Sequence, residues 1–105
     1  VSAVDTVNDC ICISGFVSTA KNVQVQLNWN AVAGASCYNV YRSTSPNVAL
    51  VAGNRIASCT DAAAHAYLDK PLVNGTKYYY VVTEVVNGAE ICHSPEINAT
   101  PIKGR

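Results

Sequence analysis

Apolar and polar residues alternate along residues 23–29, where the sequence reads VQVQLNW. The same period of two recurs over residues 37–43, CYNVYRS, and over residues 77–86, KYYYVVTEVV. Successive side chains of a β-strand point to opposite faces, so this pattern is typical of a strand with one buried face. Tyr38 lies on the inward face of the second segment. The three segments are therefore predicted to be strands.

Short groups of turn-forming residues separate these strands. Asn87-Gly88 gives the strongest signal, because both central residues of a type I′ hairpin turn need positive φ. Residues 77–86 are therefore predicted to pair with residues 89–99. The other turns are predicted at residues 33–35, 44–47 and 73–76.

No segment carries a sustained apolar stripe with a helical period. The alanine-rich stretch DAAAHAY, residues 61–67, is short and is interpreted as a turn or an irregular crossover. Six or seven short strands without a helix indicate an all-β fold, an antiparallel β-sandwich in which each sheet buries one face.

Composition and charge exclude several classes of function. The chain has 105 residues, the size of one domain, and its seven basic residues balance seven acidic ones. A neutral chain has no basic surface for nucleic acid or anionic lipid. The longest apolar runs, such as residues 48–53, are too short to span a bilayer. Nucleic-acid binding and membrane insertion are therefore not expected.

Five cysteines and few charged residues favour an extracellular or cell-surface location, where disulfides persist. The sequence contains no methionine, so Val1 is interpreted as a processed end, and a removed secretory signal would fit. The alternative is a cytosolic protein in which the cysteines are buried thiols.

The sequence offers little catalytic or metal-binding chemistry. Cys10 and Cys12 in NDCICIS are spaced C-x-C, whereas zinc sites usually use C-x2-C pairs, and His65 and His93 lie in unrelated segments. There is no nucleophile elbow, no paired carboxylates and no phosphate-binding loop. An enzyme, a metal site and a cofactor are therefore not expected.

One weak motif allows a third functional hypothesis, a protein that binds a single haem. AEICH, residues 89–93, retains one cysteine and the histidine of a c-type attachment sequence. Cys92 and His93 would hold the haem, with His65 as the second axial ligand. Cys92 in a disulfide beside an exposed His93 is the favoured interpretation.

Two separated motifs resemble a known family, the fibronectin type III domain of bacterial extracellular proteins. They are LNWNAVAGASCYNVYRSTSP at residues 27–46 and LVNGTKYYYVVTEVVNGAE at residues 72–90. The resemblance covers residues 13–101 and implies a seven-stranded antiparallel sandwich of the immunoglobulin-like class. It implies a core tryptophan, and a leucine and a tyrosine that build the tyrosine corner. The residues expected to determine the fold are Trp29, Tyr38, Leu72 and Tyr78.

The chain departs from this family pattern at three points. Residues 1–12 precede the usual first strand and are predicted to be an N-terminal extension or added strand, followed by the domain at residues 13–105. Most members lack disulfides. The family usually has a small apolar residue where Glu84 stands, and an unpaired buried carboxylate is costly. Glu84 is therefore predicted to lie at a strand end open to water, and the alternative is a polar contact that specifies a partner or a site.

The topology that the resemblance implies places the first pair of cysteines. Residues 50–58 are predicted to pair with residues 37–43 around the turn at residues 44–47. This pairing sets Cys37 nearly opposite Cys59, within reach of disulfide geometry. The first predicted disulfide therefore joins Cys37 to Cys59.

The same topology places Cys92 opposite Thr83, at the end of the sandwich where the N-terminal segment arrives. The second predicted disulfide joins Cys92 to Cys10 or to Cys12, with no preference between them. The cysteine that is left over is expected to be a free thiol or to bond a second chain.

Four surface residues could carry further contacts. Asn74 and Asn98 each begin an N-x-[ST] glycosylation sequence, and Asn74 is also explained as a turn residue. Tyr41 and Tyr79 point away from the core by alternation, so they are expected to be isolated exposed tyrosines or, alternatively, an aromatic patch that stacks on sugars.

The leading hypothesis is a non-catalytic secreted or surface module with a structural or adhesive role, stabilised by disulfides. Its expected partner is protein, including copies of itself that pair through residues 1–12 into a fibre or surface assembly. The alternative is an accessory spacer or carbohydrate-contact module of a larger extracellular enzyme that acts on polysaccharides.

Overall fold

The computed structural model describes residues 11–103, which form eight strands and a short 3₁₀ helix. Among these residues, no helix has the length and hydropathy needed to cross a bilayer. The elements are β1 (Val17–Lys21), β2 (Gln24–Asn28), β3 (Cys37–Ser43), η1 (Ala52–Asn54), β4 (Arg55–Asp61), β5 (Ala66–Asp69), β6 (Tyr78–Val86), β7 (Ala89–His93) and β8 (Ile97–Ala99).

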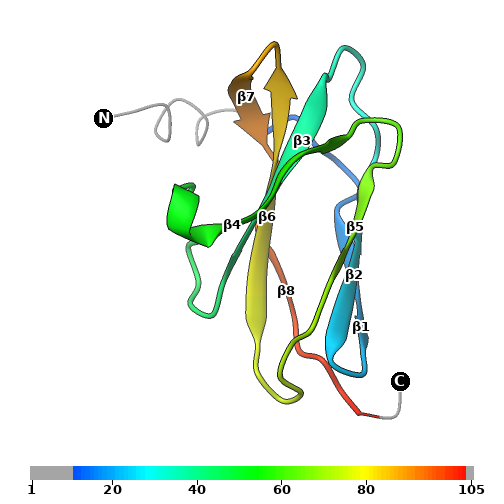
Figure 1. Cartoon of the computed structure of the whole chain (residues 1–105), viewed down its shortest axis with the longest axis vertical. Coiled ribbons are helices and arrows are strands. Elements are labelled where there is room, and N and C mark those ends of the chain that lie inside the picture. The colour runs from blue at the N-terminus through cyan, green and yellow to red at the C-terminus, as the bar shows by residue number, and fades with distance from the viewer. Residues whose placement is uncertain (1–10, 104–105) are drawn as a thin grey trace.

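The strands form two antiparallel sheets that face each other (Figure 1). One sheet has the order β1-β2-β5, and the other has the order β4-β3-β6-β7, with β8 also paired to β6. The predicted all-β sandwich is confirmed, with eight strands in place of seven.

The eighth strand arises because the predicted strand at residues 89–99 is divided in two. Asn87 and Gly88 have φ of 50° and 85°, as the hairpin turn requires, and β7 then pairs with the second half of β6. Pro95 has no N–H for the ladder, and β8 pairs with the first half of β6 beyond it. Ser94 bridges the gap, because it donates its N–H to the Val82 carbonyl and accepts the Val82 N–H on its hydroxyl, at 2.8 and 2.9 Å.

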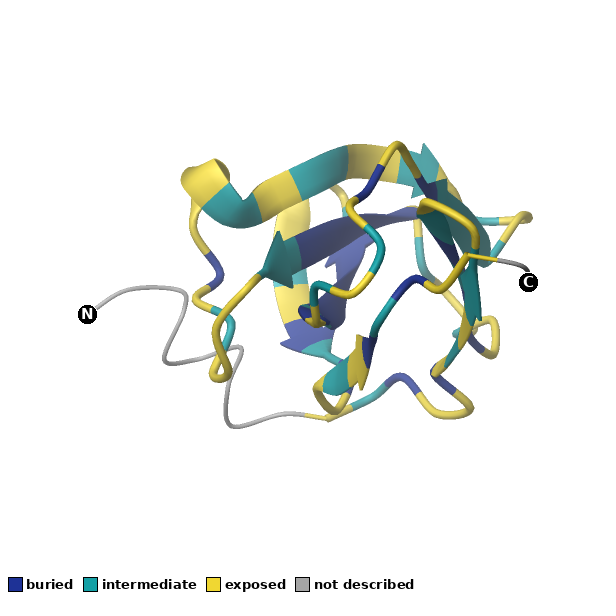
Figure 2. Cartoon of the chain, turned by 90° about the horizontal axis from the view of Figure 1, so that it is seen from below, coloured by how far each residue is buried: buried dark blue, intermediate teal, exposed yellow. Residues whose placement is uncertain are grey.

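The main core lies between the two sheets and takes buried residues from strands of both, and Figure 2 shows the buried positions along these strands. Trp29 is 2% exposed and contacts Phe16 and Tyr38 edge-on, at ring-centroid distances of 6.1 and 5.3 Å. Val23 was predicted to begin the buried face of a strand, which is wrong. It lies in the β1–β2 turn with φ of 53° and is 41% exposed.

Polar contacts close the lower part of the sandwich in Figure 1, near the C-terminal end of the described chain. The Tyr78 hydroxyl accepts the Val73 N–H at 3.0 Å, five residues upstream, which is the contact of a tyrosine corner. Asp69 on β5 accepts hydrogen bonds from Arg42 and from the Tyr80 hydroxyl, at 2.8 and 2.7 Å. Because Arg42 and Tyr80 belong to the opposite sheet, this buried carboxylate joins the two layers.

Residues 61–67 connect the two sheets. Asp61 ends β4, its carbonyl accepts the Ala64 N–H in a turn, and β5 begins at Ala66 in the other layer. The interpretation of this stretch as a turn and crossover agrees with the structure, although its last two residues already belong to β5.

Candidate functional site

Cys37 and Cys59 form a disulfide between β3 and β4, with a Cα–Cα distance of 4.8 Å. Cys37 lies opposite Asp61 in the ladder, and a bulge between Tyr38 and Val40 shifts the register of β4. Within this bulge Cys59 has φ of 53°, and its N–H donates to the Asn39 side chain at 2.7 Å. The bulge thus turns Cys59 toward its partner.

Cys12 and Cys92 form the second disulfide, which ties the N-terminal segment to β7 with a Cα–Cα distance of 5.8 Å. Beside it, Ile11 pairs with His93 in a parallel bridge, and the Cys12 N–H donates to the His93 carbonyl at 3.0 Å. Of the two alternatives for the partner of Cys92, the structure selects Cys12. Cys10 and most of the predicted extension at residues 1–12 lie outside the described residues.

The predicted position of Cys92 opposite Thr83 is wrong by one residue. A register shift after Glu84 leaves Ile91 without a partner on β6, so Cys92 pairs with Glu84 and His93 pairs with Thr83. Counting back from the hairpin turn assumed a regular ladder, and the bulge breaks that count. The haem hypothesis needed Cys92 as a free thiol, but its sulfur is bonded to Cys12.

The prediction that Glu84 is open to water is also wrong. Glu84 lies within β6 on its inward face and is 4% exposed. Its Oε1 lies 3.1 Å from the Cys92 sulfur and 3.4 Å from the Cys12 sulfur. Burial raises the pKa of the Glu84 carboxyl above its usual value. Within residues 11–103, these three side chains form the one group with ligand atoms close enough to hold a metal ion.

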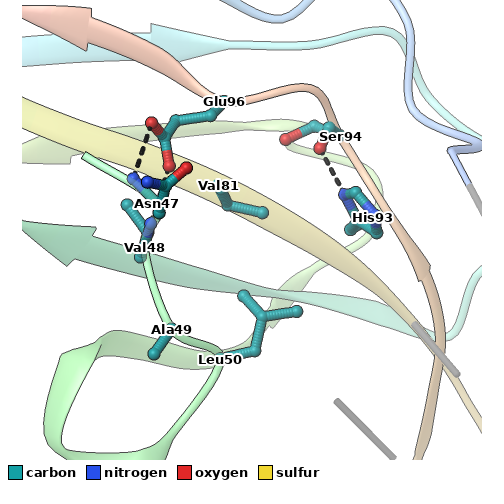
Figure 3. A pocket seen from close by; sticks show the side chains of 8 residues that line it. All are labelled: Asn47, Val48, Ala49, Leu50, Val81, His93, Ser94 and Glu96. Atoms are coloured by element: carbon teal, nitrogen blue, oxygen red, sulfur yellow. Dashed lines mark hydrogen bonds between the residues drawn. The ribbon is translucent and has the colours of Figure 1, made fainter. Parts of the chain in front are cut away.

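A pocket of about 400 Å³ lies on the outer face of the larger sheet, under the loop at residues 44–51 (Figure 3). Glu96 fixes this loop, because its carboxylate accepts the backbone N–H groups of Asn47 and Val48 at 3.1 and 2.7 Å. His93 lines the opposite wall, and its buried Nε2 has no hydrogen-bond partner among the described residues. The lining residues are Asn47, Val48, Ala49, Leu50, Val81, His93, Ser94 and Glu96.

Tyr41 was predicted to be exposed, which is wrong, because the same loop covers it. Tyr41 is 1% exposed and forms a second, small core with Leu50 and Val81, whereas Tyr79 is half-buried. The hydroxyl of Tyr41 donates to Glu90. Burial, and next the contact with Glu90, raise the pKa of Tyr41 to about 12.

Glu90 is the centre of a polar network on this outer face. Burial alone would raise its pKa, but hydrogen bonds from Tyr41, from Thr83 at 2.7 Å and from Asn39 at 2.9 Å hold the pKa of Glu90 below its usual value. The alternation of β3 did not reveal this network or the pocket, because it predicted a solvent-facing side for a strand that is buried on both faces.

The two glycosylation sequences lie in different surroundings. Both polar ends of the Asn74 side chain are used, since Oδ1 accepts the Val23 N–H and Nδ2 donates to Asn22, each at 2.8 Å. Asn98 is exposed on β8. His65 does not belong to the group of candidate metal ligands found in residues 11–103, and its Nδ1 contacts the Trp29 carbonyl at 2.9 Å.

The fold and these contacts define a disulfide-bonded β-sandwich module of the immunoglobulin-like class. No family model matches the chain. A solved structure, a fibronectin type III (Fn3)-like protein from Clostridium thermocellum, superposes with a TM-score of 0.67 at 33% identity and covers 89% of this chain and 92% of that one. The chain belongs to the fibronectin type III-like family.

Two curated relatives contain a segment similar to this chain. A poly(3-hydroxybutyrate) depolymerase from Ralstonia pickettii is 42% identical over 69 residues, which is 66% of this chain and 12% of that protein. An amylopullulanase from Thermoanaerobacter thermohydrosulfuricus is 38% identical over 93 residues, which is 85% of this chain and 6% of that protein. The chain therefore corresponds to a small part of each relative.

Proposed function

We propose that the chain is a non-catalytic accessory module of a larger extracellular enzyme that acts on a polymer, and that it serves as a stiff spacer. The observation that carries the proposal is the extent of the matches. The chain covers 92% of the solved chain of the Fn3-like protein but 12% and 6% of two enzymes named for polymer breakdown. Similarity that begins and ends with one module is expected when a module is shared between different enzymes.

The positions of the aromatic residues favour a spacer over a carbohydrate-contact surface. Proteins that bind polysaccharides commonly stack exposed aromatic rings on sugars. All eight aromatic residues lie within the described chain, and each is buried or half-buried. The large hydrophobic residues that are exposed in residues 11–103 are all valine or isoleucine. This surface offers no aromatic platform to a sugar.

The positions of the described chain ends also suit a spacer. Ile11 lies beside β7, and Ile102 donates its N–H to Lys21 at the opposite end of the sandwich (Figure 1). Neighbouring domains attached there would lie at two ends of a body whose longest extent is 40 Å. The two disulfides support a location in an oxidising, extracellular compartment.

Adhesion and fibre formation, the leading hypothesis from the sequence, gain no support from the comparisons. The self-assembly version depended on residues 1–12, of which residues 1–10 lie outside the described chain. The alternative, an accessory module, is therefore the better-supported function.

A domain exchange tests the proposal. In the amylopullulanase, the matched 93 residues are replaced by this chain or, as a control, by a flexible Gly-Ser linker of equal length. We expect the exchange with this chain to preserve the rate on insoluble polymer and the linker to lower it, with equal rates on a soluble oligomer. Equal rates for all three proteins on the insoluble polymer would contradict a spacer role.

A binding assay separates the spacer from a carbohydrate-contact module. The isolated chain is mixed with insoluble starch and with poly(3-hydroxybutyrate) granules, and the supernatant is measured after centrifugation. We expect no depletion of the chain and no release of soluble product. Saturable depletion by one polymer would overturn the spacer in favour of a polymer-binding module.

A further inference from the structure

Glu84 is a buried carboxyl group whose surroundings do not satisfy it. Its side chain is 4% exposed, and the polar contacts that its carboxyl group makes within the described chain are with the sulfurs of Cys12 and Cys92. The sulfurs of a closed disulfide carry no proton, so they cannot donate to a carboxylate. A carboxyl buried without a good partner destabilises a fold, and an apolar residue would fit the inward face of β6 better.

The three side chains meet from three separate segments of the chain. Cys12 lies in the N-terminal segment, Glu84 on β6 and Cys92 on β7, and Cys92 is directly opposite Glu84 in the ladder. Their ligand atoms all lie within 4.8 Å of one another. A convergence of two sulfurs and a carboxylate is a set of ligands that fits Zn²⁺, whereas Mg²⁺ and Ca²⁺ favour sites made of oxygen alone.

The distances fit a tetrahedral zinc site after small movements. Bond lengths of about 2.3 Å to sulfur and 2.0–2.2 Å to oxygen place a sulfur and an oxygen ligand about 3.5 Å apart. Glu84 Oε1 already lies 3.1 and 3.4 Å from the two sulfurs. Once the disulfide opens, the sulfurs need to separate to about 3.8 Å, the distance between two tetrahedral thiolate ligands.

We propose that the reduced chain binds one Zn²⁺ through Cys12, Glu84 and Cys92, with a water molecule in the fourth position. A dithiol reductant opens the site. Its two S–H bonds become one S–S bond, the Cys12–Cys92 S–S bond breaks, and each cysteine sulfur receives a proton. Zn²⁺ then takes the place of these two protons and is bound in addition by the Glu84 carboxylate.

Such a site keeps the N-terminal segment attached to β7 in both redox states. The disulfide joins Cys12 to Cys92 under oxidising conditions, and the metal joins them when the thiols are reduced, for example before oxidative folding is complete. Glu84 then has a role in the reduced state that explains why a carboxyl group stands on the inward face of β6.

Metal titration of a simplified chain tests the proposal. In a C10S/C37A/C59A variant, the remaining cysteines are Cys12 and Cys92. The variant is reduced with a phosphine under anaerobic conditions and titrated with Co²⁺, which reports thiolate ligation by a charge-transfer absorption and tetrahedral geometry by intense visible bands. We expect one Co²⁺ per chain, displaced by one Zn²⁺, and no absorption change in the oxidised variant. A reduced variant that is folded by circular dichroism and binds no Co²⁺ would overturn the proposal.

Two substitutions in the same background assign the third ligand. E84Q keeps the size of the side chain and removes its negative charge, and we expect Co²⁺ to bind at least about tenfold more weakly. E90Q is the matched control, because Glu90 lies on the same hairpin but faces the other side of the sheet, and we expect unchanged affinity. Equal affinity in E84Q and E90Q would show that Glu84 is not a ligand.

A second measurement uses the chain with all five cysteines. Zn²⁺ should raise the Tm of the reduced chain and leave the Tm of the oxidised chain unchanged, since binding to the folded state alone stabilises it. The increase should disappear in C92A. A Tm of the reduced chain that does not respond to Zn²⁺ would contradict the site.

Discussion

The proposed spacer would carry tension between its neighbours, and the Cys12–Cys92 disulfide determines how far the chain can stretch. The disulfide joins residues that are 80 apart in sequence. An extended chain spans at most about 3.6 Å per residue, so the closed disulfide withholds about 290 Å of contour length. Outside the closed disulfide, the 11 residues before Cys12 and the 13 residues after Cys92 can extend, which is at most about 90 Å.

Single-molecule stretching measures these lengths directly. The chain is placed between two marker domains of known extension and is pulled from both ends before and after reduction. We expect an unfolding extension below about 90 Å for the oxidised chain and a gain of about 290 Å when both disulfides are reduced. In a C12S/C92S variant, Cys37–Cys59 still withholds the 22 residues between its sulfurs, so the gain should be about 210 Å.

Two outcomes would refute this reasoning. An oxidised chain that releases more than about 100 Å in one event would not contain a closed Cys12–Cys92 disulfide. A C12S/C92S variant that releases the same length as the fully reduced chain would show that Cys37–Cys59 does not restrict extension. The marker domains provide the control, because their extension must not change with reduction.

Three further predictions concern the stability of the sandwich. G15A should lower the free energy of unfolding by about 1–3 kcal/mol, because Gly15 has φ of 67° and a Cβ there would lie 2.6 Å from the Asn30 side chain. At Gly53 nothing lies within 4 Å of an added Cβ, so the control G53A should change the free energy of unfolding by less than about 0.5 kcal/mol. Denaturant titrations measure both values. E96A should speed hydrogen exchange at the backbone amides of residues 47 and 48, which its carboxylate binds, and unchanged exchange there would contradict the role of Glu96. The pKa of Tyr41 is about 12 in the folded chain and about 10 in the unfolded chain, so the folded state keeps the phenol proton to higher pH. This difference stabilises the fold below pH 10, and about 3 kcal/mol of that stability is lost as the pH rises from 10 through 12. Y41F should lack this loss in alkaline unfolding experiments.

The alternation of apolar residues predicted most of the fold because it reports a local property, the burial of one strand face. The hairpin at Asn87-Gly88 could also be predicted from the sequence, because two adjacent turn residues with positive φ favour asparagine and glycine. The pairing of Cys37 with Cys59 was predicted from the topology that the family resemblance implies, in which the two strands are neighbours in sequence. Each of these features depends on residues that are close together in the chain.

The features that the sequence did not reveal depend on distant contacts. Tyr41 is buried because a loop folds over it, and that loop is fixed by Glu96, 48 and 49 residues away from the amides it binds. The bulge at Ile91 has no glycine or proline to mark it, yet it moves Cys92 by one position and places it opposite Glu84. A single shift of register thus changed the expected neighbours of the candidate site.

The two ends of the sandwich are held by different kinds of interaction, and this difference has a mechanical consequence. Both disulfides lie near the end of β6 that contains Glu84 and Val85, since Cys37 pairs with Val85 and Cys92 pairs with Glu84. The opposite end has no disulfide among the described residues and is held by core packing, by the polar contacts of Asp69 and Tyr78, and by the three-residue strand β8. Hydrogen bonds at a strand edge open more readily than covalent bonds, so tension applied through both termini should first detach β8. The covalently held end then keeps the rest of the core closed, which is the behaviour that a spacer between two enzyme domains requires.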